Sequence, residues 1–177
     1  MSKTSPRIVA ITGANTGIGA ACALELASPG THLVLACRSE TKTRPVLEKV
    51  RALGAEASFL ALDLGDLTAS ARAGEELAAR FPAIDLLVNN AGVAGARGLT
   101  KQGFEVAFGT NHLGHFAFTV PLFRALERAR GRVVNVSSGN HFSAKKLDFD
   151  AVRQTTKSRT GLPEYGVSKL ADRKSVV

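Results

Sequence analysis

The order of apolar runs along the chain is the feature that most constrains its fold. Short runs rich in β-branched residues and leucine alternate with longer segments whose apolar residues recur at helical spacing. Continuous apolar runs are typical of strands that are covered on both faces. Alternation of such strands with helices favours an α/β fold with a doubly wound parallel sheet and right-handed crossovers.

The pattern predicts five strands and at least five helices. The expected strands are Arg7–Thr12, His32–Cys37, Ser58–Leu62, Ile84–Val88 and Arg132–Ser137. The expected helices are Gly19–Leu26, Thr43–Leu53, Leu67–Arg80 and Gly103–Leu126, with a last helix that opens at Pro163 after a polar, loop-like segment at Ala151–Thr160.

Composition indicates a globular chain without a membrane segment. The 177 residues are 45% apolar, which is enough for one domain with a core. No run of eighteen apolar residues occurs, and Met1–Arg7 is too short and polar for a signal peptide or anchor, so we expect a cytoplasmic location. Cys22 and Cys37 lie in apolar segments and are interpreted as small buried side chains in a reducing compartment, with a disulfide as the alternative.

The net charge of +8 does not by itself indicate a nucleic-acid partner. The basic residues are spread from Arg7 to Lys174 and form no stripe with interleaved aromatic residues. We therefore expect no nucleic acid, and take the excess charge to favour an anionic cofactor.

A glycine-rich stretch, TGANTGIG, follows the first expected strand and leads into a helix. Glycines at positions 13, 17 and 19 allow a tight turn and close approach of a pyrophosphate to the backbone. The helix N-terminus supplies unpaired N–H groups and partial positive charge. A glycine-rich turn without a ligand is the alternative. The spacing differs from Gly-x-Gly-x-x-Gly, and the Gly-Lys-Ser/Thr ending of nucleotide-hydrolysing loops is missing.

Further motifs follow in a fixed order: NNAG at Asn89–Gly92, Asn111 within NHLGHF, VNVSS at Val134–Ser138 and YGVSK at Tyr165–Lys169. With the glycine stretch, they resemble the short-chain dehydrogenase/reductase family. The ACR at Ala36–Arg38, NHLGHF and the long gap from Ser138 to Tyr165 resemble its retinol-dehydrogenase-like branch. The resemblance implies a single dinucleotide-binding Rossmann domain over residues 1–177.

The resemblance also implies a set of residues around the dinucleotide. Asp63 would hold the adenine, or else serve as a helix cap or surface acid. Asn89 would support the adenosine side, or serve the sheet alone. The expected cofactor-binding residues are Gly13, Asn15, Thr16, Gly17, Ile18, Gly19, Arg38, Asp63, Leu64, Asn90, Ala91, Gly92, Tyr165 and Lys169.

Arg38 bears on which dinucleotide is bound. An acidic residue after the second strand accepts hydrogen bonds from the ribose of NAD, whereas an arginine suits the 2′-phosphate of NADP. The sequence therefore predicts that NADP(H) is preferred over NAD(H). A solvated surface arginine is the alternative reading of Arg38.

Tyr165 and Lys169 have the spacing of a proton-donor pair. Residues at i and i+4 share one face of a helix, so the ammonium can stabilise the phenolate of the chain's only tyrosine, whose ordinary pKa is near 10. By resemblance, Ser138 rather than Ser137 would hydrogen-bond the substrate oxygen, and Asn111 would hold a water that links Lys169 to solvent. The alternative for Asn111 is a polar residue that caps a helix kink.

The predicted function is an oxidoreductase that interconverts an alcohol and its ketone or aldehyde with NADP(H). We expect a small-molecule substrate, and the resemblance allows a homo-oligomer in the full-length form. His112 and His115 lack accompanying ligands at metal-binding spacing, so packing is preferred and no metal is expected. Rival interpretations are a fragment that binds the dinucleotide without turnover and a basic nucleic-acid binder.

Only eight residues follow Lys169. The resemblance predicts a longer helix, two more strands and a segment that closes over the substrate, so the chain is expected to be C-terminally truncated, with about five of the family's seven strands. Asp172–Val177 reads DRKSVV, which abandons the apolar helical pattern. The start of a widely used sequencing adapter, GAT CGG AAG AGC GTC GTG, encodes the same string and is followed by a stop codon. We interpret residues 172–177 as a non-native tail.

Overall fold

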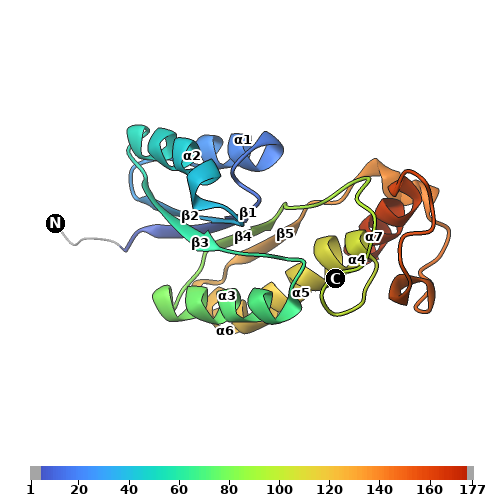
Figure 1. The fold of residues 1–177 in the computed structure, drawn as a ribbon. Helices are drawn as coiled ribbons and strands as arrows, with labels where there is room; N and C mark the ends of the chain where they lie inside the picture. Colours follow the sequence, from blue (N-terminus) through green and yellow to red (C-terminus); the bar gives the residue numbers. More distant parts are fainter. Residues whose placement is uncertain (1–4, 175–177) are drawn as a thin grey trace. The chain divides into compact units, whose positions relative to one another are not determined.

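A computed structural model describes residues 5–174, which contain a five-stranded sheet with helices on both faces (Figure 1). The strand order is β3-β2-β1-β4-β5. Parallel ladders join β1 to β2, β1 to β4 and β2 to β3. This order runs outward in both directions from β1, which confirms the predicted doubly wound α/β fold. The strands are β1 (Arg7–Thr12), β2 (Thr31–Cys37), β3 (Glu56–Ala61), β4 (Leu86–Asn89) and β5 (Arg132–Asn135).

Helical elements connect the strands, and others come after the last strand in the chain. The α-helices are α1 (Gly17–Glu25), α2 (Glu40–Ala52), α3 (Leu67–Arg80), α4 (Val106–Phe108), α5 (Gly114–Thr119), α6 (Phe123–Ala129) and α7 (Leu162–Lys174). Shorter elements are a π-helical turn, η1 (Gly109–Leu113), and the 3₁₀ turns η2 (Val120–Leu122), η3 (Gly139–Ser143) and η4 (Ala151–Arg153). None of the helices within residues 5–174 has the length and apolar character that a membrane crossing requires.

The central strands are apolar because both of their faces are covered. Val9, Ile11, Leu33, Val34 and Leu35 are fully buried. Around these strands, α1 and α2 lie on one face of the sheet, while α6 and the C-terminal half of α3 lie on the other (Figure 1). This two-sided burial explains why the strands read as continuous apolar runs instead of alternating ones.

The long helix expected over Gly103–Leu126 is broken into shorter pieces. Residues before Val106 do not join it, because an isolated antiparallel bridge pairs Leu99 with Glu105. The Glu105 carboxylate then accepts hydrogen bonds from the backbone N–H groups of Ala107 and Phe108, both at 2.9 Å, and so caps α4. The expected strand Arg132–Ser137 is also shorter, since β5 ends at Asn135.

The chain divides into two compact units. The first comprises the described residues up to Leu62, Glu75–Ala91 and Pro121–Val134; the second comprises Asp63–Gly74, Gly92–Val120 and the described residues from Asn135 onward. The glycine-rich loop and Arg38 belong to the first unit, and the Tyr165–Lys169 pair to the second. Of the predicted tail, Asp172–Lys174 continue α7, whereas Ser175–Val177 lie outside the described residues.

Candidate active site

The glycine-rich loop in the first unit is shaped by two close backbone approaches. Gly13 has a φ of +66°, and a Cβ there would lie 2.8 Å from the Ala91 Cα. A Cβ at Gly19 would lie 2.5 Å from both the Gly13 carbonyl oxygen and Asn90 Nδ2. Neither position can therefore carry a side chain without moving the loop or the end of β4.

Thr12 holds the loop against the end of β4, a role that our sequence analysis missed. Its buried hydroxyl oxygen accepts hydrogen bonds from the backbone N–H groups of Asn90 and Ala91, both at 2.9 Å. In return, Asn90 Nδ2 donates to the Thr12 carbonyl at 2.9 Å. The Asn90 side chain thus serves the scaffold, and the position of Thr12 at the end of a buried strand was the signal available in the sequence.

The surface that this loop presents remains open. Thr16 and Gly17 are exposed, and Ile18 is 72% exposed. Thr16 precedes α1 with an extended backbone, and its side chain makes no capping hydrogen bond with the described part of the helix. Arg38 is exposed directly after β2. The N-terminal N–H groups of α1 are therefore available to an anion, as a pyrophosphate site requires.

Three further predicted dinucleotide residues belong to the second unit. The Asp63 carboxylate is exposed, which fits its interpretation as a surface acid, and it accepts a hydrogen bond from the Gly65 N–H at 3.0 Å within a turn and not at a helix start. A contact between Asp63 and the adenine stays a prediction. Leu64 is buried. A Cβ at Gly92 would lie 3.3 Å from Asn111 Oδ1, so this glycine allows Asn111 to approach the chain after β4.

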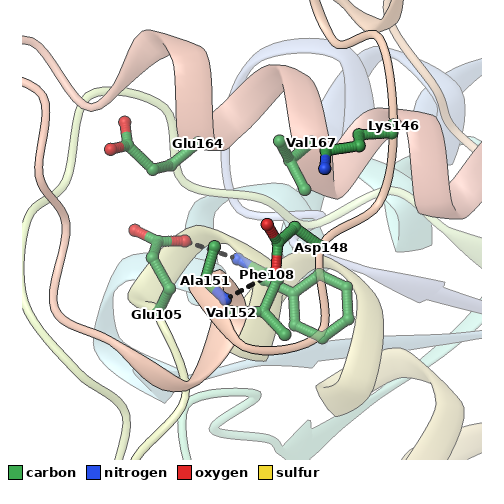
Figure 2. A pocket seen from close by; sticks show the side chains of 8 residues that line it. All are labelled: Glu105, Phe108, Lys146, Asp148, Ala151, Val152, Glu164 and Val167. Carbon is green, nitrogen blue, oxygen red and sulfur yellow. Dashed lines mark hydrogen bonds between the residues drawn. The ribbon is translucent and has the colours of Figure 1, made fainter.

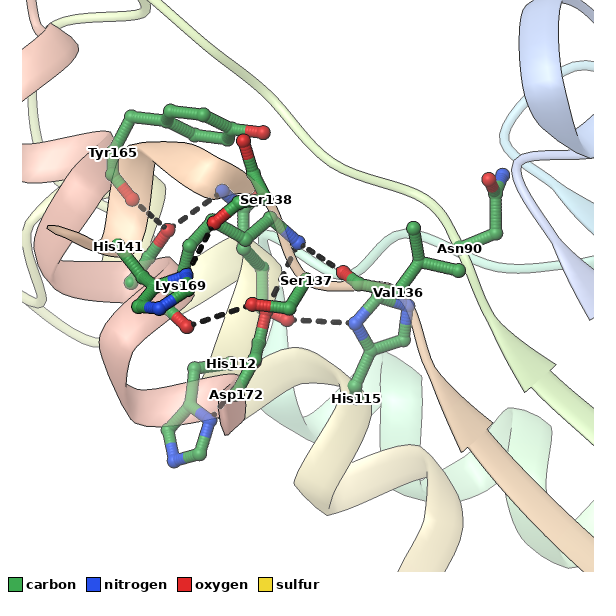
Figure 3. Close-up of polar contacts among 12 residues, drawn as sticks. Asn90, His112, His115, Val136, Ser137, Ser138, His141, Tyr165, Lys169 and Asp172 are labelled. Atoms are coloured by element: carbon green, nitrogen blue, oxygen red, sulfur yellow. Dashed lines mark hydrogen bonds and ion pairs between the residues drawn. The ribbon is translucent and has the colours of Figure 1, made fainter. Parts of the chain in front are cut away.

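Tyr165 and Lys169 lie on one face of α7, as their spacing predicted. Lys169 Nζ lies 5.9 Å from the centre of the Tyr165 ring. The lysine is only 4% exposed, and its ammonium donates to the Val136 carbonyl at 2.7 Å and to Asp172 Oδ2 at 2.9 Å (Figure 3). A buried ammonium near the phenol ring is the arrangement that phenolate stabilisation needs.

The two adjacent serines have different partners. Ser137 Oγ donates to the Lys169 carbonyl at 3.0 Å and thereby ties the chain after β5 to α7. Ser138 Oγ instead accepts from the Asn140 N–H at 3.2 Å, which leaves its own proton available to a substrate oxygen. Figure 3 shows Ser138 beside Tyr165 and Lys169, so the structure is compatible with the predicted choice of Ser138.

Asn111 is fully buried in the π-helical turn η1. Its side chain accepts from the Val93 N–H at 2.8 Å and donates to the Val93 carbonyl at 3.0 Å and to Ser168 Oγ at 2.9 Å. These bonds connect α7, η1 and the segment after β4. The role of Asn111 in a water relay stays a prediction. A π-helical turn at a polar buried residue is frequent at functional sites.

The histidines behind α7 are held in different ways. His115 is buried and its Nδ1 lies 2.7 Å from the Asn111 carbonyl oxygen. Burial lowers the pKa of His115 from 6.5 to about 4, against a smaller opposing effect of that hydrogen bond. His112 Nδ1 lies 3.2 Å from Asp172 Oδ1. His115 is therefore a packed core residue, as predicted. His112 also contacts the carboxylate of Asp172, a residue that the sequence analysis assigns to the tail.

A small pocket in the second unit does not include the predicted catalytic side chains (Figure 2). Its volume of about 60 Å³ suits water molecules and not a substrate of many atoms. It is lined by Glu105, Phe108, Lys146, Asp148, Ala151, Val152, Glu164 and Val167.

Over residues 5–174, no group of three His, Cys, Asp or Glu side chains could hold a metal ion. Cys22 and Cys37 are free thiols; Cys37 is buried as predicted, whereas Cys22 is only partly buried.

Comparison with known proteins decides the family. Residues 7–147 match the family described as short chain dehydrogenase. The chain belongs to the short-chain dehydrogenase/reductase family. Among the relatives of this chain, human Retinol dehydrogenase 13 is 38% identical over 93% of the chain and 51% of its own length. Mouse Retinol dehydrogenase 12 is 40% identical over 94% of the chain and 53% of its own length.

The solved structures give the same assignment. A metagenomic short-chain oxidoreductase in complex with NADP is 28% identical and superposes with a TM-score of 0.74, over 95% of this chain and 72% of that one. The identity to Retinol dehydrogenases 13 and 12 confirms the expected resemblance to the retinol-dehydrogenase-like branch. This short-chain dehydrogenase/reductase spans about half the length of the curated relatives it matches.

Proposed function

We propose that this chain is the dinucleotide-binding and proton-transfer part of an NADP(H)-dependent oxidoreductase that interconverts an alcohol and its ketone or aldehyde. The observation that carries the proposal is the buried Lys169 ammonium beside the Tyr165 ring on α7. The residues of the glycine-rich loop fit a dinucleotide, since the N–H groups at the start of α1 are open to a pyrophosphate. The bound dinucleotide would supply or accept the hydride.

The residues of the second unit would handle the proton. In the reducing direction, the Tyr165 phenol gives its proton to the carbonyl oxygen, and the positive charge of Lys169 stabilises the phenolate that remains. The Ser138 hydroxyl donates a hydrogen bond to the same oxygen and so stabilises its developing charge. In the oxidising direction the tyrosinate accepts the proton from the alcohol.

The preference for NADP(H) rests on Arg38. Its exposed guanidinium directly after β2 suits bidentate pairing with a 2′-phosphate, and a similar oxidoreductase was solved with NADP. Replacing Arg38 by Asp should shift the ratio of dissociation constants toward NADH by at least about tenfold, because it removes the phosphate partner and adds a ribose acceptor. Fluorescence titration measures both constants. Equally tight binding of NADH and NADPH by the unchanged chain would contradict this role.

Adjacent serines allow a matched test of the chemistry. In a chimera that also carries the C-terminal half of human Retinol dehydrogenase 13, Tyr165→Phe and Ser138→Ala should each lower carbonyl reduction by about a hundredfold or more, with NADPH affinity nearly unchanged. Lys169→Met should damage both turnover and binding, since by resemblance the lysine also contacts the ribose.

Ser137→Ala is the control, because its hydroxyl serves the α7 backbone and should leave the rate within a few-fold of the unchanged chain. Full activity of Tyr165→Phe would exclude the mechanism.

The same proposal includes a small-molecule alcohol or carbonyl substrate, no nucleic-acid partner and a cytoplasmic location.

A further inference from the structure

Asp172 has an unusual position for the first residue of the predicted tail. It lies on α7 one turn after Lys169 and is 7% exposed. Its Oδ2 is 2.9 Å from Lys169 Nζ, and its Oδ1 is 3.2 Å from His112 Nδ1 (Figure 3). Both side chains of the Lys169–Asp172 pair are nearly inaccessible to solvent. Little water is present to screen the pair, so its charges act strongly on one another.

The ammonium of Lys169 has three N–H donors. The Val136 carbonyl takes one at 2.7 Å and the Asp172 carboxylate takes another. Only one donor is left for any further partner. The carboxylate also cancels most of the positive charge that would otherwise act on Tyr165.

We propose that Asp172 is an inhibitory positioning residue, whose carboxylate neutralises and holds the Lys169 ammonium and so weakens the activation of Tyr165. Only the consequence of this inference for turnover rests on the proposed function. The inference itself concerns the effect of the buried Asp172 carboxylate on the ionisation of the Tyr165 phenol. The groups that face Asp172 are Lys169 on α7, His112 on η1 and His115 on α5.

The composition of the chain makes this effect directly measurable. Tyr165 is the only tyrosine and the chain has no tryptophan, so the ultraviolet absorbance change at alkaline pH reports the ionisation of this phenol alone. Burial lowers the pKa of His115 to about 4, so this neighbour is neutral throughout such a titration. From the distances to Nζ, Asp172 Oδ2 lies within about 9 Å of the ring centre. A unit charge at such a distance shifts an ionisation by on the order of one pH unit.

Asp172→Asn keeps the shape of the side chain and removes its charge. The midpoint of the absorbance titration should fall by about one pH unit, because the ammonium is then unopposed. The double change Lys169→Met with Asp172→Asn replaces the ion pair by neutral side chains of similar size. Its midpoint should return to within about 0.3 pH unit of the unchanged chain, since a neutral pair and a cancelled pair present similar fields.

Asp150→Asn is the matched control, because it removes an exposed carboxylate from the same unit. It should leave the midpoint unchanged. Asp172→Ala carries the same expectation as Asp172→Asn and replaces it if the asparagine variant does not fold. The proposal is overturned if removal of the carboxylate leaves the midpoint in place, or if the unchanged chain already titrates as low as Asp172→Asn. The titration needs neither cofactor nor substrate, so a wrong assignment of the reaction would not affect it.

Discussion

At the scale of single residues, the most informative feature is a buried polar network behind α7. The Asn111 side chain is hydrogen-bonded to the backbone of Val93 and to the hydroxyl of Ser168. The backbone carbonyl oxygen of Asn111 is hydrogen-bonded to His115 Nδ1. Buried polar groups lower the stability of a protein unless they are bonded, so this network costs little only while His115 stays neutral. The network therefore links the stability of the second unit to pH.

The pKa of His115 sets the pH range of this link. It is 6.5 in the unfolded chain and about 4 in the folded one, so between these values the unfolded state binds more protons. Stability should thus fall as pH falls from about 6.5 toward 4, with a loss of about 2 kcal/mol between pH 7 and pH 5 from this residue. Urea unfolding at the two pH values measures it.

His115→Gln should lose this part of the pH dependence, although it lowers stability at both pH values. His32→Gln is the control, because His32 is only partly buried and lies elsewhere in the chain, on β2. An equal pH dependence in the unchanged chain and in His115→Gln would show that burial does not keep His115 neutral.

At the scale of elements, the sequence predicts what depends on local pattern and misses what depends on contacts across the fold. The bounds of β1 and α3 agree with expectation residue for residue, because apolar periodicity and strand boundaries are local. The start of the expected Gly103–Leu126 helix was not predictable, since Glu105 is held in the Leu99–Glu105 bridge and its N–H donates to the distant Val152 carbonyl at 2.9 Å. A contact between residues far apart in the sequence overrode helical spacing there.

In the candidate site, too, the sequence predicts local features and misses contacts between distant residues. Motif spacing placed Tyr165 and Lys169 on one face of α7, because positions four apart always share a helical face. The pairing of Ser137 with the α7 backbone depends on residues far apart in the sequence and could not be read from it. The ion pair of Asp172 with Lys169 was predictable, since the two residues are three apart on one helix. The sequence analysis missed this pair because it assigned Asp172 to the non-native tail.

At the scale of the whole molecule, β5 is the element that the additional residues of the longer relatives would affect most. It ends the strand order, and its Val133 and Val134 are 40% and 45% exposed. An apolar edge strand exposed to water pairs readily with other chains. Since the curated relatives are about twice as long, we expect their additional residues to cover this edge and to complete the substrate site.

This expectation separates dinucleotide binding from turnover. The chain of 177 residues should bind NADPH, because the glycine-rich loop, Thr12 and Arg38 form a connected part of the first unit. It should reduce carbonyl compounds at least about a hundredfold more slowly than a chimera in which the C-terminal half of human Retinol dehydrogenase 13 replaces Arg173–Val177, because the added residues contribute to substrate positioning while Asp172 is kept in both chains. NADPH titration and steady-state reduction rates, both repeated with Tyr165→Phe, measure the two properties separately. Binding without turnover in the chimera would favour a pure binding module, whereas efficient, Tyr165-dependent reduction by the 177-residue chain alone would show that the additional half is dispensable.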